Sequence, residues 1–180
     1  GKDQGRVQIM QINFPICMRW LLQHEGGFSN HPLDPGNATM LGVTKGTYED
    51  YIGRSVSIDE IKALTQEDVE PIYRSRYWNK CQADSLPSGI DWMVFDWAVN
   101  SGPRRASQAL QRAVGSRADG AIGPNTLDAV ARCNDVETVD KIHAEREAFY
   151  RSLSTFPTFG RGWLRRNDET MEQATNLAHR

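Results

Sequence analysis

The stretch that decides the fold is Ile90-Asp-Trp-Met-Val-Phe-Asp-Trp-Ala-Val-Asn100. It is apolar on nearly every side, and only a helix that is buried on most of its faces tolerates such a pattern. Gly102-Pro103 ends this helix and starts the next one. The sequence therefore predicts a central buried helix packed against other helices.

Two polar residues interrupt this apolar helix. Asp96 and Asn100 lie one helical turn apart, and buried polar groups must find partners. Two interpretations remain open for them. They brace neighbouring helices, or they line a substrate cleft.

Upstream of the central helix, a second stretch carries the chemistry: His24-Glu-Gly-Gly-Phe-Ser-Asn-His-Pro-Leu-Asp-Pro-Gly-Asn37. Pro15 suits the first turn of an apolar helix that runs from Ile16 to Glu25 and stops at Gly26-Gly27. Glu25 then faces the negative end of the helix dipole among apolar neighbours, and both effects disfavour ionisation.

Asp34 lies in a turn cluster and should be better solvated, so it should stay ionised. Two carboxyl groups in contrasting environments can cleave a glycosidic bond, one as proton donor and one in support of water or the sugar cation. A solvated helix end at Glu25 is the simpler alternative.

The order of residues adds a resemblance. Glu25-Gly-Gly-Phe-Ser-Asn30, Asp34-Pro-Gly-Asn37 and Gly42-Val-Thr44 resemble the signature Glu-Gly-Gly-Tyr-Ser-Asn, Asp-Pro-Gly-Gly and Gly-Ile-Thr of glycoside hydrolase family 108. That family comprises lysozyme-like N-acetylmuramidases, found as phage-type endolysins and as muramidases that assist toxin secretion. The resemblance implies that Glu25 is the proton donor, Asp34 its partner carboxylate and Asn30 a substrate contact.

A threonine is expected to complete the site. The spacing from Glu25 to Asp34 also resembles that of phage lysozymes, in which a threonine further along holds the attacking water. Thr39 and Thr44 are the candidates, and Thr44 is favoured because it matches the family signature. A hydroxyl in a loop is otherwise a turn or cap residue.

Three aromatic residues, Tyr73, Tyr77 and Trp78, follow the capping boxes expected at Ser57–Glu60 and Thr65–Asp68. Core packing is their simplest interpretation. The segment also resembles the family's Tyr-x-x-x-Tyr-Trp, which implies substrate contact. Asp96 and Asn100 likewise match a family segment, Phe-Asp-x-x-Val-Asn-x-Gly.

Domain organisation follows from a break at Leu86-Pro-Ser-Gly89. We expect a catalytic lobe over residues 10–88 and a helical lobe over residues 89–180. The pattern Leu110-Gln111, Asp119-Gly120, Gly123-Pro124-Asn-Thr126 resembles predicted peptidoglycan-binding domains that follow this muramidase family. The final segment, which contains Trp163, Arg165 and Arg166, resembles the family's ending, with the arginines expected in solvent.

Composition limits the alternatives. The 180 residues carry a net charge of −2, far too little basic charge for a nucleic-acid partner. No apolar run reaches the ~20 residues that span a bilayer. Three cysteines at unrelated positions, Cys17, Cys81 and Cys133, are expected to be free thiols. Residues 1–9 are expected to be left over from cloning.

Other chemistries lack their motifs. A His-Glu-x-x-His zinc site would need a second histidine at Phe28, and no nucleophile elbow or phosphate-binding glycine loop is present. His143 is expected to be structural. We therefore expect no metal and no cofactor.

The sequence thus predicts a mainly α, lysozyme-like fold, all-α or with a small irregular or β lobe, whose two lobes flank a cleft. The resemblance implies hydrolysis of the β-1,4 bond between N-acetylmuramic acid and N-acetylglucosamine. We expect a monomer, although the sequence itself does not give the oligomeric state. A lytic transglycosylase or a non-catalytic wall-binding protein are the alternatives. Without a signal sequence, we expect a protein made in the bacterial cytoplasm that reaches the cell wall by a separate export route.

Overall fold

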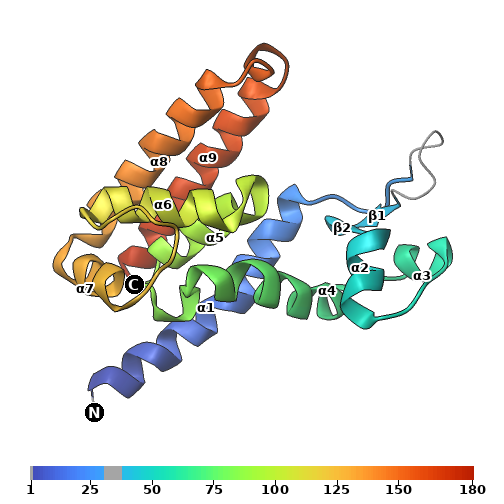
Figure 1. Cartoon of the computed structure of the whole chain (residues 1–180), viewed down its shortest axis with the longest axis horizontal. Coiled ribbons are helices and arrows are strands. Elements are labelled where there is room, and N and C mark those ends of the chain that lie inside the picture. The colour runs from blue at the N-terminus through green and yellow to red at the C-terminus, as the bar shows by residue number, and fades with distance from the viewer. Residues whose placement is uncertain (1, 31–37) are drawn as a thin grey trace. The chain divides into compact units, whose positions relative to one another are not determined.

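The computed structural model describes residues 2–30 and 38–180, and the side chains of residues 13–30 and 38–180. The chain is predominantly helical with a small two-stranded sheet, as the sequence predicts (Figure 1). It divides into two compact units. We call Pro15–Arg76 the hairpin unit, and Gly1–Phe14 together with Tyr77–Arg180 the helical unit.

The hairpin unit combines a short antiparallel β hairpin with several helices. Its elements are the C-terminal part of α1 (Lys2–His24), then β1 (Thr39–Met40), β2 (Val43–Thr44), α2 (Lys45–Ile52), α3 (Ile58–Lys62) and α4 (Gln66–Tyr73). In the hairpin, Thr39 pairs with Thr44 and Met40 with Val43. The helix expected to start at Pro15 starts much earlier, and Pro15 lies inside α1.

Local capping fixes α3 and α4 where the sequence predicts them. Ser57 and Glu60 form a reciprocal capping box at α3, and Thr65 and Asp68 form one at α4. Each box satisfies backbone N–H groups that the first helical turn leaves without partners. α4 begins directly after Thr65 and contains Pro71.

After Phe14, the helical unit continues from Tyr77, which lies in the wider helical turn Arg74–Trp78. The short 3₁₀ turns Asn79–Cys81 and Ala83–Ser85 come next. Five helices follow: α5 (Ile90–Ser101), α6 (Pro103–Val114), α7 (Pro124–Arg132), α8 (Asp135–Ser152) and α9 (Phe156–Ala178). α8 and α9 are long helices that pack side by side (Figure 1). The predicted boundary at residues 88–89 lies inside this unit.

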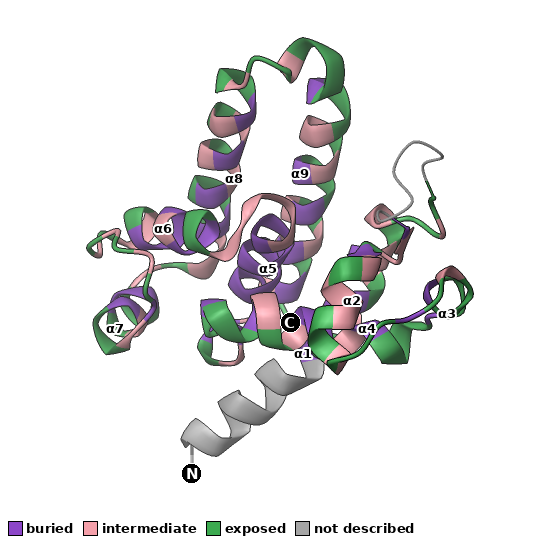
Figure 2. Ribbon diagram, turned by 45° about the vertical axis from the view of Figure 1, so that its right-hand side comes forward, coloured by how far each residue is buried: buried purple, intermediate pink, exposed green. Residues whose placement is uncertain are grey.

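α5 is the buried centre of the helical unit. Nine of its residues, Ile90 to Ala98, are buried (Figure 2), and it packs against α6, α8 and α9. Trp78 meets Phe95 of this helix edge to face, with ring centroids 5.2 Å apart. The predicted central buried helix is confirmed.

The three cysteines are free thiols, as predicted. Burial raises the pKa of the Cys81 thiol to about 11, although a hydrogen bond from the Ser107 hydroxyl opposes this. Cys81 is therefore protonated and unreactive at neutral pH.

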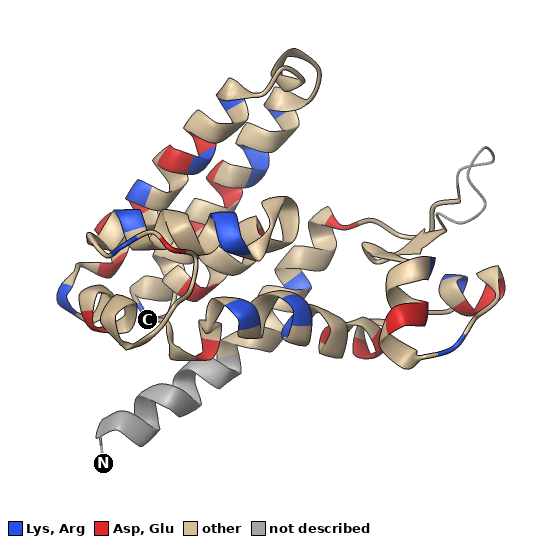
Figure 3. Cartoon of the chain, viewed as in Figure 1, with Lys and Arg blue, Asp and Glu red and all other residues tan. Residues whose placement is uncertain are grey.

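α8 carries acidic and basic residues along its length, whereas in α9 the arginines Arg161, Arg165 and Arg166 come before the acidic residues Asp168, Glu169 and Glu172 (Figure 3). Within the described residues, none of the helices combines the length and the apolar character that a membrane crossing requires.

Candidate active site

Glu25 lies directly after the last residue of α1, as predicted. Its backbone N–H still donates to the carbonyl oxygen of Leu21 at 3.0 Å, so the helical pattern carries the residue to its position. Its side chain is half-buried. The apolar face of α1 beneath it is anchored by Cys17, Met18 and Leu21, which are fully buried.

The tip of the β hairpin approaches this glutamate. Leu41 and Gly42 form a two-residue turn in which both have positive φ, 53° and 77°. Such a turn matches the twist of a hairpin, but the left-handed region is unfavourable for leucine. The Tyr73 hydroxyl at the end of α4 donates a 2.7 Å hydrogen bond to the carbonyl oxygen of Leu41. A residue of α4, outside the two strands, thus holds the turn in place.

Gly42 leaves room for the glutamate. A Cβ at this position would lie 2.3 Å from the Tyr73 hydroxyl oxygen, 2.9 Å from Oε2 of Glu25 and 3.0 Å from its Cβ. The carboxyl group of Glu25, the phenol of Tyr73 and the backbone of Gly42 therefore meet at one point. The structure brings these three predicted or signature residues together within the hairpin unit.

Thr44 has a structural role at the start of α2. It is the N-cap of α2: its Oγ1 accepts from the backbone N–H of Thr47 at 3.1 Å and donates to the Thr47 hydroxyl at 2.9 Å. Only one lone pair of the Thr44 hydroxyl is left for a further partner. A water-holding role for Thr44 stays a prediction.

Asp34 lies outside the described residues. The strand ends on either side of its segment are close together, because Ser29 and Thr39 exchange two backbone hydrogen bonds of 2.8 Å. Asn30, which follows Ser29, is exposed and available to a substrate. Its role as a substrate contact also stays a prediction.

The three aromatic candidates differ in their exposure and contacts. Tyr73 is 2% exposed and its hydroxyl faces Glu25, whereas Tyr77 is half-buried in the helical unit. Trp78 is 0% exposed: its ring packs on Phe14, and its indole N–H donates to Asp84 at 2.8 Å. The assignment of Trp78 to substrate binding is wrong, because its ring and its N–H are both used inside the core.

Asp96 is also not a cleft residue. It is 0% exposed and its carboxylate is 2.9 Å from the guanidinium groups of both Arg146 and Arg166. It accepts a third bond, of 3.0 Å, from the Thr170 hydroxyl. Burial alone would raise the pKa of Asp96, but the two arginines outweigh burial and hold it at about 2. Asp96 joins α5 to α8 and α9, which is the bracing alternative.

Asn100 braces α5 against α8. Its side-chain oxygen accepts hydrogen bonds from the hydroxyl groups of Tyr150 and Ser101. These contacts leave no acceptor position of that oxygen for a sugar hydroxyl. The substrate-binding prediction for Asn100 is thus not supported by the use of its oxygen.

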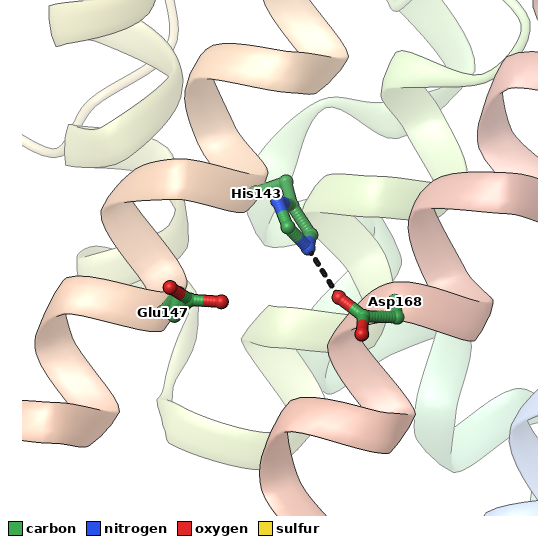
Figure 4. Close-up of side chains that lie close together, drawn as sticks. All are labelled: His143, Glu147 and Asp168. Atoms are coloured by element: carbon green, nitrogen blue, oxygen red, sulfur yellow. Dashed lines mark hydrogen bonds and ion pairs between the residues drawn. The ribbon is translucent and has the colours of Figure 1, made fainter.

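One group among the described residues has the composition of a metal site. His143 and Glu147 on α8 and Asp168 on α9 have ligand atoms within 4.8 Å of one another (Figure 4). Each already has a protein partner: His143 Nε2 lies 2.7 Å from Asp168 Oδ1, and Glu147 pairs with Arg151 at 3.3 Å. Helix pairing accounts for the arrangement, as expected for a structural histidine.

Comparison with known proteins bears on the role of this geometry. The model of the family described as Glycosyl hydrolase 108 matches residues 18–102, which include Glu25, Gly42 and Tyr73. A solved structure, Brucella abortus SagA, is 39% identical with a TM-score of 0.82, over 94% of this chain and 98% of that one. The chain belongs to glycosyl hydrolase family 108.

The second family match lies within the helical unit. A model described as "Predicted Peptidoglycan domain" matches residues 105–168, from α6 to α9. A comparison with curated protein sequences gave no match. This family 108 protein is therefore a glycoside hydrolase that acts on peptidoglycan.

Proposed function

We propose that this family 108 protein is an N-acetylmuramidase that hydrolyses the β-1,4 bond between N-acetylmuramic acid and N-acetylglucosamine. The observation that carries the proposal is the position of Glu25, whose Oε2 lies close to Gly42 together with the Tyr73 hydroxyl, in the part of the chain that matches the hydrolase family. A carboxylic acid fixed in one place can deliver a proton to a glycosidic oxygen.

In the proposed mechanism Glu25 protonates the leaving oxygen of the scissile bond. Asp34 supports the attacking water or the positive charge that develops on the sugar ring, and Thr44 uses its remaining lone pair to orient that water. Asn30 contacts a neighbouring sugar. The substrate then lies beside the end of α1.

Digestion of purified sacculi tests the proposal. The wild-type protein should release fragments with reducing muramic acid ends, read by mass spectrometry after borohydride reduction. Glu25→Gln should keep the fold and lose turnover by at least about a hundredfold, in the range general acid catalysis contributes. Glu67→Gln, an exposed glutamate at the start of α4, is the matched control and should stay fully active.

Two results would contradict the assignment. Fragments with 1,6-anhydro ends would make the protein a lytic transglycosylase, because the muramic acid hydroxyl would then replace water. Reducing glucosamine ends would place the cleavage at the other glycosidic bond. A fully active Glu25→Gln protein would remove Glu25 from the mechanism.

We further propose that the enzyme works as a monomer on the cell wall, in lysis or in toxin secretion, after export from the bacterial cytoplasm. A substrate in the wall is the reason to expect export. Cell fractionation should find the protein in the periplasm, and light scattering should give the mass of a single chain. Detection only in the cytoplasm would overturn the location.

A further inference from the structure

The loop that joins α6 to α7 borders two adjacent surface cavities within the helical unit. The larger one, of about 360 Å³, is lined by Arg117, Asp128 and Arg132 among others, and the smaller one, of about 240 Å³, lies next to it. They share Ser116, Arg117 and Asn125. We call the two together the α6–α7 pocket.

Buried hydrogen bonds make this loop rigid. The side chain of Gln111 is 1% exposed, donates to Asp119 Oδ1 at 2.9 Å and to the Ala121 carbonyl at 3.1 Å, and accepts from the Gly120 N–H at 2.8 Å. The Thr126 hydroxyl joins Gln111 to α7 at 3.2 Å. A buried amide side chain thus fixes both the loop and the start of α7.

The pocket carries charges of both signs. Arg117, Asp128 and Arg132 line the larger cavity, and Arg117 and Asp119 line the smaller one, where the charge of Arg117 helps to lower the pKa of the Asp119 carboxyl. Within the part of the chain that the structure describes, the side chains of Arg117, Asp128 and Arg132 are exposed and make no hydrogen bond or salt bridge. Two guanidinium groups on a preformed surface are well suited to bind carboxylates, because each can offer two parallel N–H donors. Asp128 between them suits an ammonium group or amide N–H groups.

The lining also argues against a sugar as the ligand. Sugar rings commonly pack on the flat apolar faces of aromatic side chains. None of the described residues that line either cavity is aromatic. The volumes lie at or below the lower end of the range for small-molecule sites, which suits a short peptide better than a chain of hexoses.

We propose that the α6–α7 pocket binds the acidic stem peptide of peptidoglycan, with Arg117 and Arg132 holding its carboxylates. The proposal rests on the proposed function in that peptidoglycan is the polymer the enzyme acts on. It assigns the peptide branch to the helical unit, whereas the hairpin unit carries the proton donor for the glycan strand. The wall is then recognised through both of its chemical components.

Calorimetric titration with a defined peptide tests the proposal. The probe is the free tetrapeptide L-Ala-γ-D-Glu-meso-diaminopimelate-D-Ala, and the protein is the full chain carrying Glu25→Gln. We expect binding that weakens at least about tenfold in the Arg117→Ala/Arg132→Ala variant, since hydrogen bonds to charged groups are worth that much in affinity. The same peptide with amidated carboxyl groups should bind as weakly to the unchanged pocket.

The matched control removes the same charge elsewhere. Arg161 and Arg165 of α9 are exposed and lie in the same unit, so Arg161→Ala/Arg165→Ala should leave peptide affinity unchanged. Equal weakening by both pairs would overturn the proposal, because binding would then follow net charge. Binding of tetra-N-acetylchitotetraose in place of the peptide, lost in the Arg117/Arg132 pair, would overturn it in favour of a glycan.

Failure of this proposal can be told apart from failure of the muramidase assignment. Peptide binding is measured in Glu25→Gln protein and does not depend on which bond is cut. Co-sedimentation with intact sacculi gives a second readout, in which the Arg117/Arg132 pair should reduce the bound fraction and the Arg161/Arg165 pair should not. Unchanged melting temperatures of both pairs show that the fold is retained.

Discussion

The hydroxyl of Tyr73 donates a 2.7 Å hydrogen bond to the carbonyl oxygen of Leu41, 32 residues earlier in the chain. This bond ties the last residue of α4 to a leucine held at a φ of 53°, directly before the glycine that faces Glu25. A residue in the left-handed region persists only when its surroundings hold it there. Tyr73 therefore determines where the proposed acid can lie.

Tyr73→Phe should lower kcat while KM changes little. The carbonyl of half-buried Leu41 loses its hydrogen bond, which costs about 0.5–1.5 kcal/mol, and the turn beside Glu25 loosens. Turnover of solubilised peptidoglycan over a range of pH measures the effect, since a positioning role also changes the pH profile. Tyr51→Phe, at a tyrosine that is 43% exposed, is the control. Equal kinetics in both variants would show that Tyr73 only fills space.

Gly42→Ala should remove most activity without unfolding the helical unit. The added Cβ would meet the Tyr73 hydroxyl at 2.3 Å and Oε2 of Glu25 at 2.9 Å, so the carboxyl group must move. We expect a loss of at least about a hundredfold in kcat/KM, because a shift of about 1 Å in a reacting group has that effect.

Two other glycines separate the causes of that loss. Gly53 has nearly the same φ, +76°, but nothing within 4 Å of a Cβ, so Gly53→Ala carries the backbone strain without the clash. Gly46 inside α2 has neither a positive φ nor a close neighbour, so Gly46→Ala should raise the free energy of unfolding by about 0.5–1 kcal/mol. If Gly53→Ala is as inactive as Gly42→Ala, the loss comes from strain and not from displacement of Glu25.

Replacement of Thr44 distinguishes capping from catalysis. Thr44→Val should lower the free energy of unfolding by about 0.5–2 kcal/mol, since α2 loses its N-cap. Thr44→Asn should restore the cap and the stability but leave turnover low, because the hydroxyl that orients water is gone. Urea titrations and sacculus digestion measure the two effects. Turnover that returns together with stability would assign Thr44 to the cap alone.

The carboxyl group of Asp91 should make the free energy of unfolding decrease as pH rises from about 4 to about 7. Burial raises the pKa of this carboxyl to about 7, although hydrogen bonds from Asn13 and the N–H groups of Trp92 and Gly89 oppose it. The unfolded chain loses this proton near pH 4 and the folded chain near pH 7. Between these values the folded state binds more protons, so its stability decreases with pH and levels off above about 7.

Asp91→Asn tests this linkage. The asparagine cannot ionise, so the gap between variant and wild-type free energies of unfolding should shift in favour of the variant from pH 4 to 7. Urea unfolding at several pH values gives both curves. If the curves run parallel across this range, the Asp91 carboxyl does not keep its proton in the folded protein.

Local chemistry made much of this fold predictable. The boxes Ser57–Glu60 and Thr65–Asp68 and the start at Gly102-Pro103 depend on residues within one helical turn. So does the position of Glu25, since Gly26-Gly27 ends α1 beside it. These features need no knowledge of the rest of the chain.

Features that depend on distant residues were not predictable. The partners of Asp96 lie 50 and 70 residues away, and the expectation that Arg166 stays in solvent was wrong because it pairs with Asp96. α9 continues through Gly160 and Gly162, two residues that disfavour helices, because packing against α8 outweighs their propensity. Tyr73 was singled out for substrate contact, yet its hydroxyl is taken by a carbonyl that only the fold brings near.

The ion pairs that Asp96 makes with Arg146 and Arg166 restrict how this protein can diverge. Loss of the aspartate alone would leave two cations facing each other in the interior, and breaking such a buried pair costs about 3–5 kcal/mol. Natural selection should therefore reject single replacements at these sites and accept only concerted ones. Homologues in which one of the three positions is apolar should have lost the other charges as well.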